Sequence, residues 1–436
     1  MKNTTTLTSQ QITLDLLPQK FGRRGIIWTA ALLLIAMVGA FAYYRQVRYG
    51  LVVTHMRDYV SWGIYISNFV FFVAISLVGS LITAILRLAN VHWATPLTRI
   101  AEIIAVSAIV FASIIIVVDM GRPERFLNLM IHGRLQSPIM WDVIVIGTYF
   151  FISLLLLYFP LLPDLKILIG LKEKPGKWLN KLYRFQGSFW KGTADQFRLS
   201  DKAINILCII IIPVAFCIHT VTSWLFATTY RPGWDSTNFG AYFISGAFLV
   251  GAGAVVVAMY IFRKAYKLEK YIYEKHFEKM GRVVVLLALL YLYFNINEYL
   301  VPAFKMKKPE EAHLTQLFAG EYAPLFWFAI MIGMIIPICI LVFKKGRKPL
   351  PVFIAGIMVV IGAWFKRYLI VTPTLLHPFL PMNDVPESYH HYFPSWEEWA
   401  IAMGSLAGAL LIITFFARIY PIIPIHETIS ENESTA

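Results

Sequence analysis

The segment DMGRPERFLNLMIHGRLQSPIMWD (residues 119–142) joins two strongly apolar stretches of the chain. The first apolar run, residues 109–118, ends in a carboxylate at Asp119. A tight Gly-Arg-Pro turn and a short polar loop follow, and the next apolar run begins around Asp142. An apolar run that stops at an acid is typical of a helix that leaves a membrane, because charged side chains are costly in hydrocarbon. The segment therefore predicts two carboxylates at one rim of a membrane domain.

The composition agrees with a membrane protein. Of the 436 residues, 58% are hydrophobic, whereas soluble domains contain about 45–50%. The apolar residues gather in runs of about 20, the length that crosses about 30 Å of hydrocarbon. Period-2 alternation, which would indicate a barrel, is missing from these runs, and helices satisfy their backbone hydrogen bonds in lipid. We expect an all-α polytopic membrane protein.

Ten transmembrane helices are predicted within one domain, residues 25–420, flanked by an N-terminal segment, 1–24, and a C-terminal tail, 421–436. The predicted spans are 25–44, 63–88, 97–119, 140–162, 203–227, 239–263, 281–301, 322–343, 349–371 and 397–420.

The distribution of Lys and Arg predicts the orientation in the cell (inner) membrane. If the N-terminus is cytoplasmic, the inner loops carry about 27 basic residues and the outer loops about 10, which places both termini in the cytoplasm. This asymmetry also explains the net charge of +14 without nucleic acid. In the two large basic loops, 163–202 and 264–282, amphipathic helical pieces near residues 178–190 and 266–280 are expected to contact membrane lipids with anionic headgroups.

Cysteine and histidine patterns argue against cofactors bound by this chain. The three cysteines all fall in apolar runs, without the spacing of an iron–sulfur, covalent haem or zinc site, so no metal site is expected. A haem b would need paired histidines inside the spans, and only His219 lies well within one. Electrons would then come from a cofactor in another subunit.

Titratable side chains from five predicted helices lie at one depth, near the outer face. Depth follows from a rise of 1.5 Å per residue. Glu102 alone lies toward the inner face. The groups at the outer level are Asp119, Asp142, His219, Glu298, Lys366 and Arg367.

A group of titratable side chains at one depth near the membrane surface suits quinone redox chemistry. A quinone head needs hydrogen-bond donors at its carbonyl oxygens, and a quinol needs proton acceptors, which buried carboxylates and a histidine can supply. Arg122 or Arg367 could hold a negative charge, and Trp141 and Tyr65 could enclose the ring. Aromatic residues at this depth are equally expected as an interfacial belt.

Several motifs make the chain resemble the NrfD/PsrC family of membrane subunits of respiratory oxidoreductases. The most specific are DMGRPERF and SPIMWD within residues 119–142. The long, ten-helix members, including those of alternative complex III, are similar in the later motifs. The remaining matches are SWGIYISNFVFFVAISLVGSLI (61–82), RIAEIIAV (99–106), HTVTSW (219–224), RPGWDSTNFGAYFISGA (231–247), KRYLIVTPTL (366–375) and HPFLP (377–381).

The resemblance implies NrfD/PsrC-like helical bundles that bind menaquinone or ubiquinone as substrate near the outer face. It also implies a ferredoxin-like iron–sulfur subunit on the periplasmic side, with a molybdopterin-type or multihaem cytochrome subunit beyond it. Some family members are thought to carry protons. Two departures are clear: alternative complex III members tend to have histidine where this chain has Asp119, and Lys366 stands where an acid often precedes the arginine.

Two alternative functions stay open: a secondary transporter, for which Pro213 would interrupt the helix 203–227, and a structural anchor.

The residue chemistry and the family resemblance together predict three groups of residues. The predicted roles are catalysis for Asp119, Asp142 and His219; quinone binding for Arg122, Trp141, Tyr65, Ser137 and Arg367; and a proton path for Glu102, Glu298 and Asp235.

Overall fold

The computed structural model describes residues 8–19, 22–89, 91–171, 176–380 and 382–435. Residues 1–7 and 20–21 of the predicted N-terminal segment, and Pro381 of the HPFLP motif, lie outside this range. Every regular element in the described residues is helical. The predicted all-α fold is confirmed.

Ten of the described helices are long and apolar enough to cross a membrane, and each predicted span falls on one of them. The chain is a multi-pass membrane protein. The spans are α2 (Arg23–Tyr49), α3 (Ile64–Leu88), α4 (Thr95–Asp119), α6 (Pro138–Tyr158) continued by α7 (Leu161–Gly170), α9 (Ala194–Ala227), α10 (Phe239–Ala265), α11 (Glu274–Lys305), α13 (Ala323–Ile330) continued by a π-helical turn (Met331–Ile335) and α14 (Ile336–Val342), α15 (Pro349–Leu375) and α16 (Trp396–Ile419).

Shorter helices cover the two ends of the bundle. They are α1 (Ser9–Leu16), α5 (Phe126–His132), α8 (Lys177–Gln186), α12 (Lys308–Phe318) and α17 (Ile425–Thr435), with 3₁₀ turns at Leu51–Val53, His92–Ala94, Pro123–Arg125, Lys344–Arg347 and Glu387–His390.

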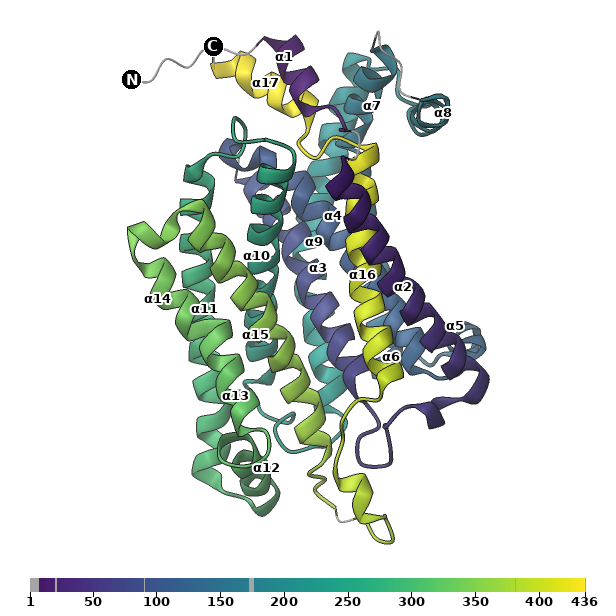
Figure 1. The fold of residues 1–436 in the computed structure, drawn as a ribbon, viewed down its shortest axis with the longest axis vertical. Coiled ribbons are helices and arrows are strands. Elements are labelled where there is room, and N and C mark those ends of the chain that lie inside the picture. Colours follow the sequence, from purple (N-terminus) through teal and green to yellow (C-terminus); the bar gives the residue numbers. More distant parts are fainter. Residues whose placement is uncertain (1–7, 20–21, 90, 172–175, 381, 436) are drawn as a thin grey trace.

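Helix α3 lies at the centre and joins two groups of helices (Figure 1). On one side it packs against α4 and α9, with α6 behind them; on the other it packs against α10 and α15, with α11 beyond. Helices α2 and α16 pair with each other beside α4. Small residues make the close packing possible: a Cβ added at Gly79 of α3 would lie 2.1 Å from the carbonyl oxygen of Ala101, and one at Gly251 of α10 would lie 2.2 Å from Val78 Cβ.

The two ends of the bundle differ in what covers them (Figure 1). We call the end with α5 and α12 the α12 end, and the end with α1, α7, α8 and α17 the α17 end. Helices α4, α9, α11 and α15 finish at the α12 end, while α3, α6, α10 and α16 begin there. The topology thus gathers the predicted outer residues at a single end.

Two local predictions were wrong. The segment between Asp119 and Asp142 is not only a loop, because a 3₁₀ turn and α5 form within it. Pro213 does not interrupt the fifth span, since α9 runs from Ala194 to Ala227 through it. A proline removes one backbone donor, and α9, which packs against α3 and α6, remains helical through that position.

Candidate functional site

Asp142 is fixed between two helices at the α12 end. Pro138 opens α6, where a missing backbone N–H costs nothing, and Asp142 follows one turn later with a buried side chain. Thr222 Oγ1 of α9 donates to Asp142 Oδ1 at 2.7 Å and also lies 2.8 Å from the carbonyl oxygen of Ile218. Because the hydroxyl has one proton, it can serve only one of these acceptors at a time.

His219 lies one turn before Thr222 on α9 and is fully buried. Its ring stands 6.0 Å from the Phe243 ring, and neither of its nitrogens has a hydrogen-bond partner among the described residues. Arg367 of α15 lies on the same phenylalanine, with its guanidinium 4.6 Å from the ring centre and Nη2 donating to the Phe243 carbonyl oxygen at 3.2 Å. Asp142, Thr222, His219 and Arg367 form a row across three helices, which we call the Asp142 row.

A glycine makes room for this row. At Gly246 of α10, an added Cβ would lie 2.7 Å from the Tyr291 ring and 3.1 Å from Arg367 Nη2. Buried polar atoms are normally hydrogen-bonded, so an unpartnered histidine and an unpartnered arginine nitrogen, Nη1, next to each other need an explanation. The row offers free hydrogen-bonding capacity inside an apolar bundle.

Asp119 belongs to a second group. It ends α4, and its Oδ1 is buried without a partner among the described residues. Next to it, the hydroxyl of the fully buried Tyr65 donates to Gln46 Oε1 at 2.6 Å, and Gln46 Nε2 donates to the Val118 carbonyl oxygen at 2.8 Å. Glu398 of α16 is close enough to interact electrostatically with Asp119 and Tyr65.

Glu398 is itself held by the chain around it. Its carboxylate accepts from the Tyr392 hydroxyl at 2.6 Å, from His55 N at 2.8 Å and from Ser395 N at 2.9 Å. Gly63 makes the approach of this tyrosine possible, since an added Cβ would lie 2.1 Å from its hydroxyl oxygen. The Asp119 group thus unites α2, α3, α4 and α16.

The remaining predicted residues are spread out. Arg122 is exposed, Ser137 is half-buried, and half-buried Trp141 donates through Nε1 to the Leu135 carbonyl oxygen. Asp235 is exposed. Glu102 is buried near the α17 end, beside Arg99, and its separation of 17 positions from Asp119 corresponds to about 25 Å along α4.

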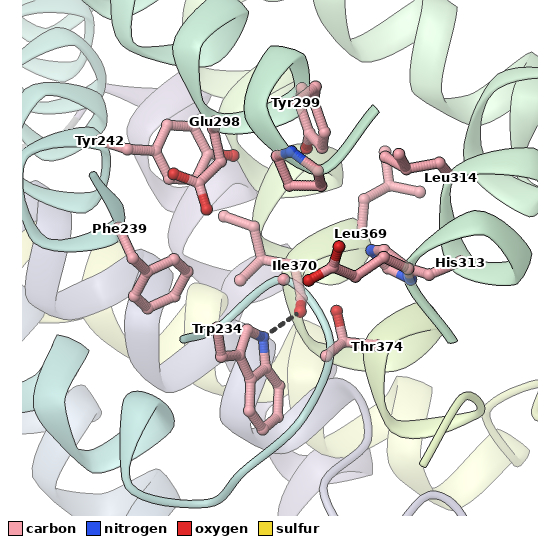
Figure 2. Close-up of a pocket in the computed structure, with 13 residues that line it drawn as sticks. Trp234, Phe239, Tyr242, Glu298, Tyr299, His313, Leu314, Leu369, Ile370 and Thr374 are labelled. Atoms are coloured by element: carbon pink, nitrogen blue, oxygen red, sulfur yellow. Dashed lines mark hydrogen bonds between the residues drawn. The ribbon is translucent and has the colours of Figure 1, made fainter. Parts of the chain in front are cut away.

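A small pocket, open to solvent, lies between α10, α11, α12 and α15 (Figure 2). Of the predicted site residues only Glu298 lines it, accepting from Ser236 Oγ at 2.8 Å and from Asn238 Nδ2 at 2.9 Å. Three polar atoms on its buried lining lack a partner among the described residues. We call this the α12 pocket, and these atoms are the Tyr242 hydroxyl, Glu310 Oε2 and His313 Nδ1.

Lys366 lies behind the wall of the α12 pocket in an aromatic cage. Its Nζ donates to the Tyr299 hydroxyl at 2.8 Å and lies 4.6 Å and 4.5 Å from the ring centres of Tyr299 and Phe326. No carboxylate of the described residues lies within 4.0 Å of this buried ammonium.

On α12, burial and the neighbouring His377 lower the pKa of His313 to about 3, so its ring is neutral.

Sequence reasoning missed several of these residues. Glu310 and His313 lie three positions apart on α12, a spacing that places them on one helix face. The segment KPEEAHLTQLF shows this spacing but falls between two spans. Within the described ranges, no group of three or more His, Cys, Asp or Glu side chains is arranged to hold a metal ion. The other missed residues are Gln46, Thr222 and Glu398.

A family model described as "Polysulphide reductase, NrfD" matches residues 52–378 of the chain. The chain belongs to the NrfD family. The resemblance expected from the motifs is confirmed, and the match covers the Asp142 row, Asp119 and the α12 pocket.

Curated relatives match this NrfD chain over most of their length. It is 23% identical over 410 residues to a selenate reductase subunit of Mesobacillus selenatarsenatis, covering 91% of this chain and 94% of the relative. It is 25% identical to a putative dimethyl sulfoxide reductase membrane subunit of Halobacterium salinarum, over 80% and 78% of the two chains. The menaquinone reductase integral membrane subunit of Nitratidesulfovibrio vulgaris is 23% identical, over 92% of each chain.

Proposed function

We propose that this NrfD chain is the quinone-reactive integral membrane subunit of a respiratory oxidoreductase complex. It exchanges electrons between the menaquinone or ubiquinone pool and a peripheral ferredoxin-like iron–sulfur subunit. The observation that carries the proposal is the Asp142 row, a line of buried polar side chains with unused hydrogen-bonding atoms at one end of an apolar bundle. The relatives support it, because they are named as subunits of selenate, dimethyl sulfoxide and menaquinone reductases.

The chemistry of the row suits a quinone head group. The unpartnered nitrogens of His219 can donate to a carbonyl oxygen or accept from a quinol hydroxyl. Asp142 is the group we assign to take or give the proton, and the single proton of Thr222 can move between Asp142 and the Ile218 carbonyl as that carboxyl changes charge. Arg367, which lies against the same Phe243 ring as His219, places a positive charge near them.

We assign the α12 end to the periplasmic side and both termini to the cytoplasm. The excess of Lys and Arg in the loops of the α17 end supports this orientation. The iron–sulfur subunit would then cover the Asp119 and Asp142 rim and pass electrons to or from a molybdopterin-type or multihaem cytochrome subunit. The exposed Arg122 and the half-buried Ser137 and Trp141 lie on the segment that this partner would contact.

Proton exchange is the finer part of the proposal. The α12 pocket gives Glu298 a route to the aqueous phase at the α12 end, with Asp235 at its exposed side and Lys366 behind it. Glu102 lies near the opposite end, so any path across the membrane must connect two groups that the fold keeps apart. The unpartnered polar atoms of the pocket can hold the water molecules that such exchange needs.

The test is Asp142→Asn in the intact complex. The amide keeps the shape but cannot take the proton, so quinone-linked turnover should fall by about 10²–10⁴-fold while assembly with the partner subunits persists. Asp58→Asn, an exposed acid in the loop before α3, is the matched control and should keep the wild-type rate. A wild-type rate in Asp142→Asn, measured on assembled complex, would remove Asp142 from the mechanism.

A further inference from the structure

Helix α8 differs in direction from the membrane-spanning helices. Figure 1 shows α8 end-on at the side of the α17 end, whereas the long helices run down the page. Its axis therefore lies across the bundle, which is the direction of a helix that rests in the plane of a membrane surface.

The inner face of α8 is fixed to the bundle by hydrogen bonds. Tyr183 is buried, and its hydroxyl donates to the Ile419 carbonyl oxygen at the end of α16 at 2.5 Å. Gln186 accepts from the Tyr420 hydroxyl at 2.6 Å through its side chain and from the Tyr158 hydroxyl at 2.7 Å through its carbonyl oxygen. The ends of α6 and α16 thus set which side of α8 faces outward.

The side of α8 that faces away from the bundle, together with the residues just after it, combines cations with large apolar side chains. Residues 177, 181 and 184 are exposed at helical spacing, and Phe185 and Phe189 remain 78% and 84% accessible. None of the three cations forms an ion pair with a residue that the structure describes. No acid occurs between Gly176 and Ala194. We call this surface the α8 stripe; it comprises Lys177, Lys181, Arg184, Trp178 and Phe185 of α8 and Phe189, which follows the helix.

We propose that the α8 stripe binds anionic phospholipid headgroups of the leaflet at the α17 end. Three cations at one level match a layer of lipid phosphates, and each is worth a several-fold gain in affinity for an anionic surface. The exposed tryptophan and phenylalanines beside them match the boundary between headgroups and acyl chains, where aromatic rings are enriched. If this surface faced only water, these large apolar rings would remain exposed to it, which is unfavourable. The proposal does not depend on the quinone site.

The experiment measures lipid binding by the full-length chain in detergent. Native mass spectrometry would count phosphatidylglycerol and phosphatidylcholine molecules retained during a titration. The wild type should retain phosphatidylglycerol about 100-fold more tightly, and Lys177→Gln/Lys181→Gln/Arg184→Gln should lose that preference. The matched control is Lys344→Gln/Lys345→Gln/Lys348→Gln, a cluster at the same end of the spans, which should keep it.

Further variants separate a lipid surface from other anion sites. Phe185→Ala/Phe189→Ala should weaken binding of both lipids, because it removes the apolar half of the stripe without touching the charges. All three variants alter exposed side chains, so their melting temperatures should match the wild type. An α8 variant that keeps the lipid preference, or a control that loses it equally, would overturn the proposal.

Two more outcomes would also overturn it. Inorganic phosphate that displaces the phospholipid at equal concentration would show an ordinary anion site. Amine-reactive labelling of the assembled, lipid-free complex that leaves the α8 lysines unmodified would show that a partner protein covers the stripe instead.

Discussion

Two groups of buried charged side chains, one at each end of the bundle, differ in how they are paired. At the α17 end, Arg99 Nη1 lies 2.5 Å from Asp164 Oδ2, with both side chains fully buried. The same carboxylate accepts from Ile425 N at 3.1 Å and His426 N at 2.9 Å, at the start of α17. At the α12 end, by contrast, His219 has two unpartnered nitrogens and Lys366 has no carboxylate within ion-pair distance among the described residues.

This difference separates buried charges that stabilise the fold from buried polar groups that are available to a substrate. A buried ion pair whose carboxylate also accepts two backbone donors fixes the C-terminal segment to α4 and α7, and it leaves that carboxylate little capacity for a ligand. Unpartnered buried polar groups destabilise the protein when no ligand is bound. They are expected where a substrate or a water molecule supplies the missing hydrogen bonds. We expect substitutions at the α17 end to change stability and those at the α12 end to change turnover.

The largest expected effect is on stability, at Arg99→Leu. It leaves Asp164 buried without its cation, which should lower the free energy of unfolding by about 3–5 kcal/mol. Thermal melting of the purified chain would measure this, while turnover per assembled complex should stay within about twofold. The control Arg282→Leu removes an exposed pair with Glu278 and should cost less than about 1 kcal/mol. Equal effects of the two variants would remove the contrast between the ends.

His219→Leu probes the opposite end. It removes two unpartnered nitrogens in a similar volume, so the free energy of unfolding should be unchanged or slightly higher. Quinone-linked turnover should fall about 100-fold if the ring donates to or accepts from the quinone. A variant that melts much lower than the wild type and keeps its rate would show that His219 serves packing instead.

The α12 pocket should make stability depend on pH through His313. Its ordinary pKa is about 6.5, and in the fold it is lowered to about 3. Between these values the unfolded chain binds a proton that the folded chain does not, so stability falls as the pH is lowered through 6.5. From pH 7.5 to pH 5 the loss should be about 2 kcal/mol.

Melting curves at the two pH values would measure this loss. His313→Gln should show a smaller loss than the wild type, whereas His132→Gln, an exposed histidine at the same end, should match it. An identical pH dependence in His313→Gln and the wild type would mean that the buried ring does not remain neutral.

The smallest expected effect concerns the position of Asp142. Thr222→Val removes its hydroxyl donor without changing its shape, and turnover should fall about tenfold, as expected for one hydrogen bond to an acid. Thr220→Val is the matched control, because among the described residues that hydroxyl bonds to the Phe216 carbonyl oxygen of its own helix alone. A similar rate in the two variants would show that Thr222 does not position the carboxylate.

The sequence alone determined the membrane architecture. All ten spans, and the end at which Asp119 and Asp142 lie, follow from runs of apolar residues, because the cost of polar groups in hydrocarbon acts on each segment independently. The sequence could not show that α9 stays helical through Pro213, since this depends on the helices packed around it.

Only the tertiary structure decided which polar groups act together. Thr222 meets Asp142 across 80 positions of the chain, and Arg367 reaches Phe243 across 124. The structure also separated Asp119, which lies with Tyr65 and Glu398, from the Asp142 row, although the two acids stand at the two ends of one segment, residues 119–142. Hydrophobic periodicity is a local property, whereas the partners of a buried polar group come from helices whose neighbours are fixed by close packing, and no spacing along the chain encodes them.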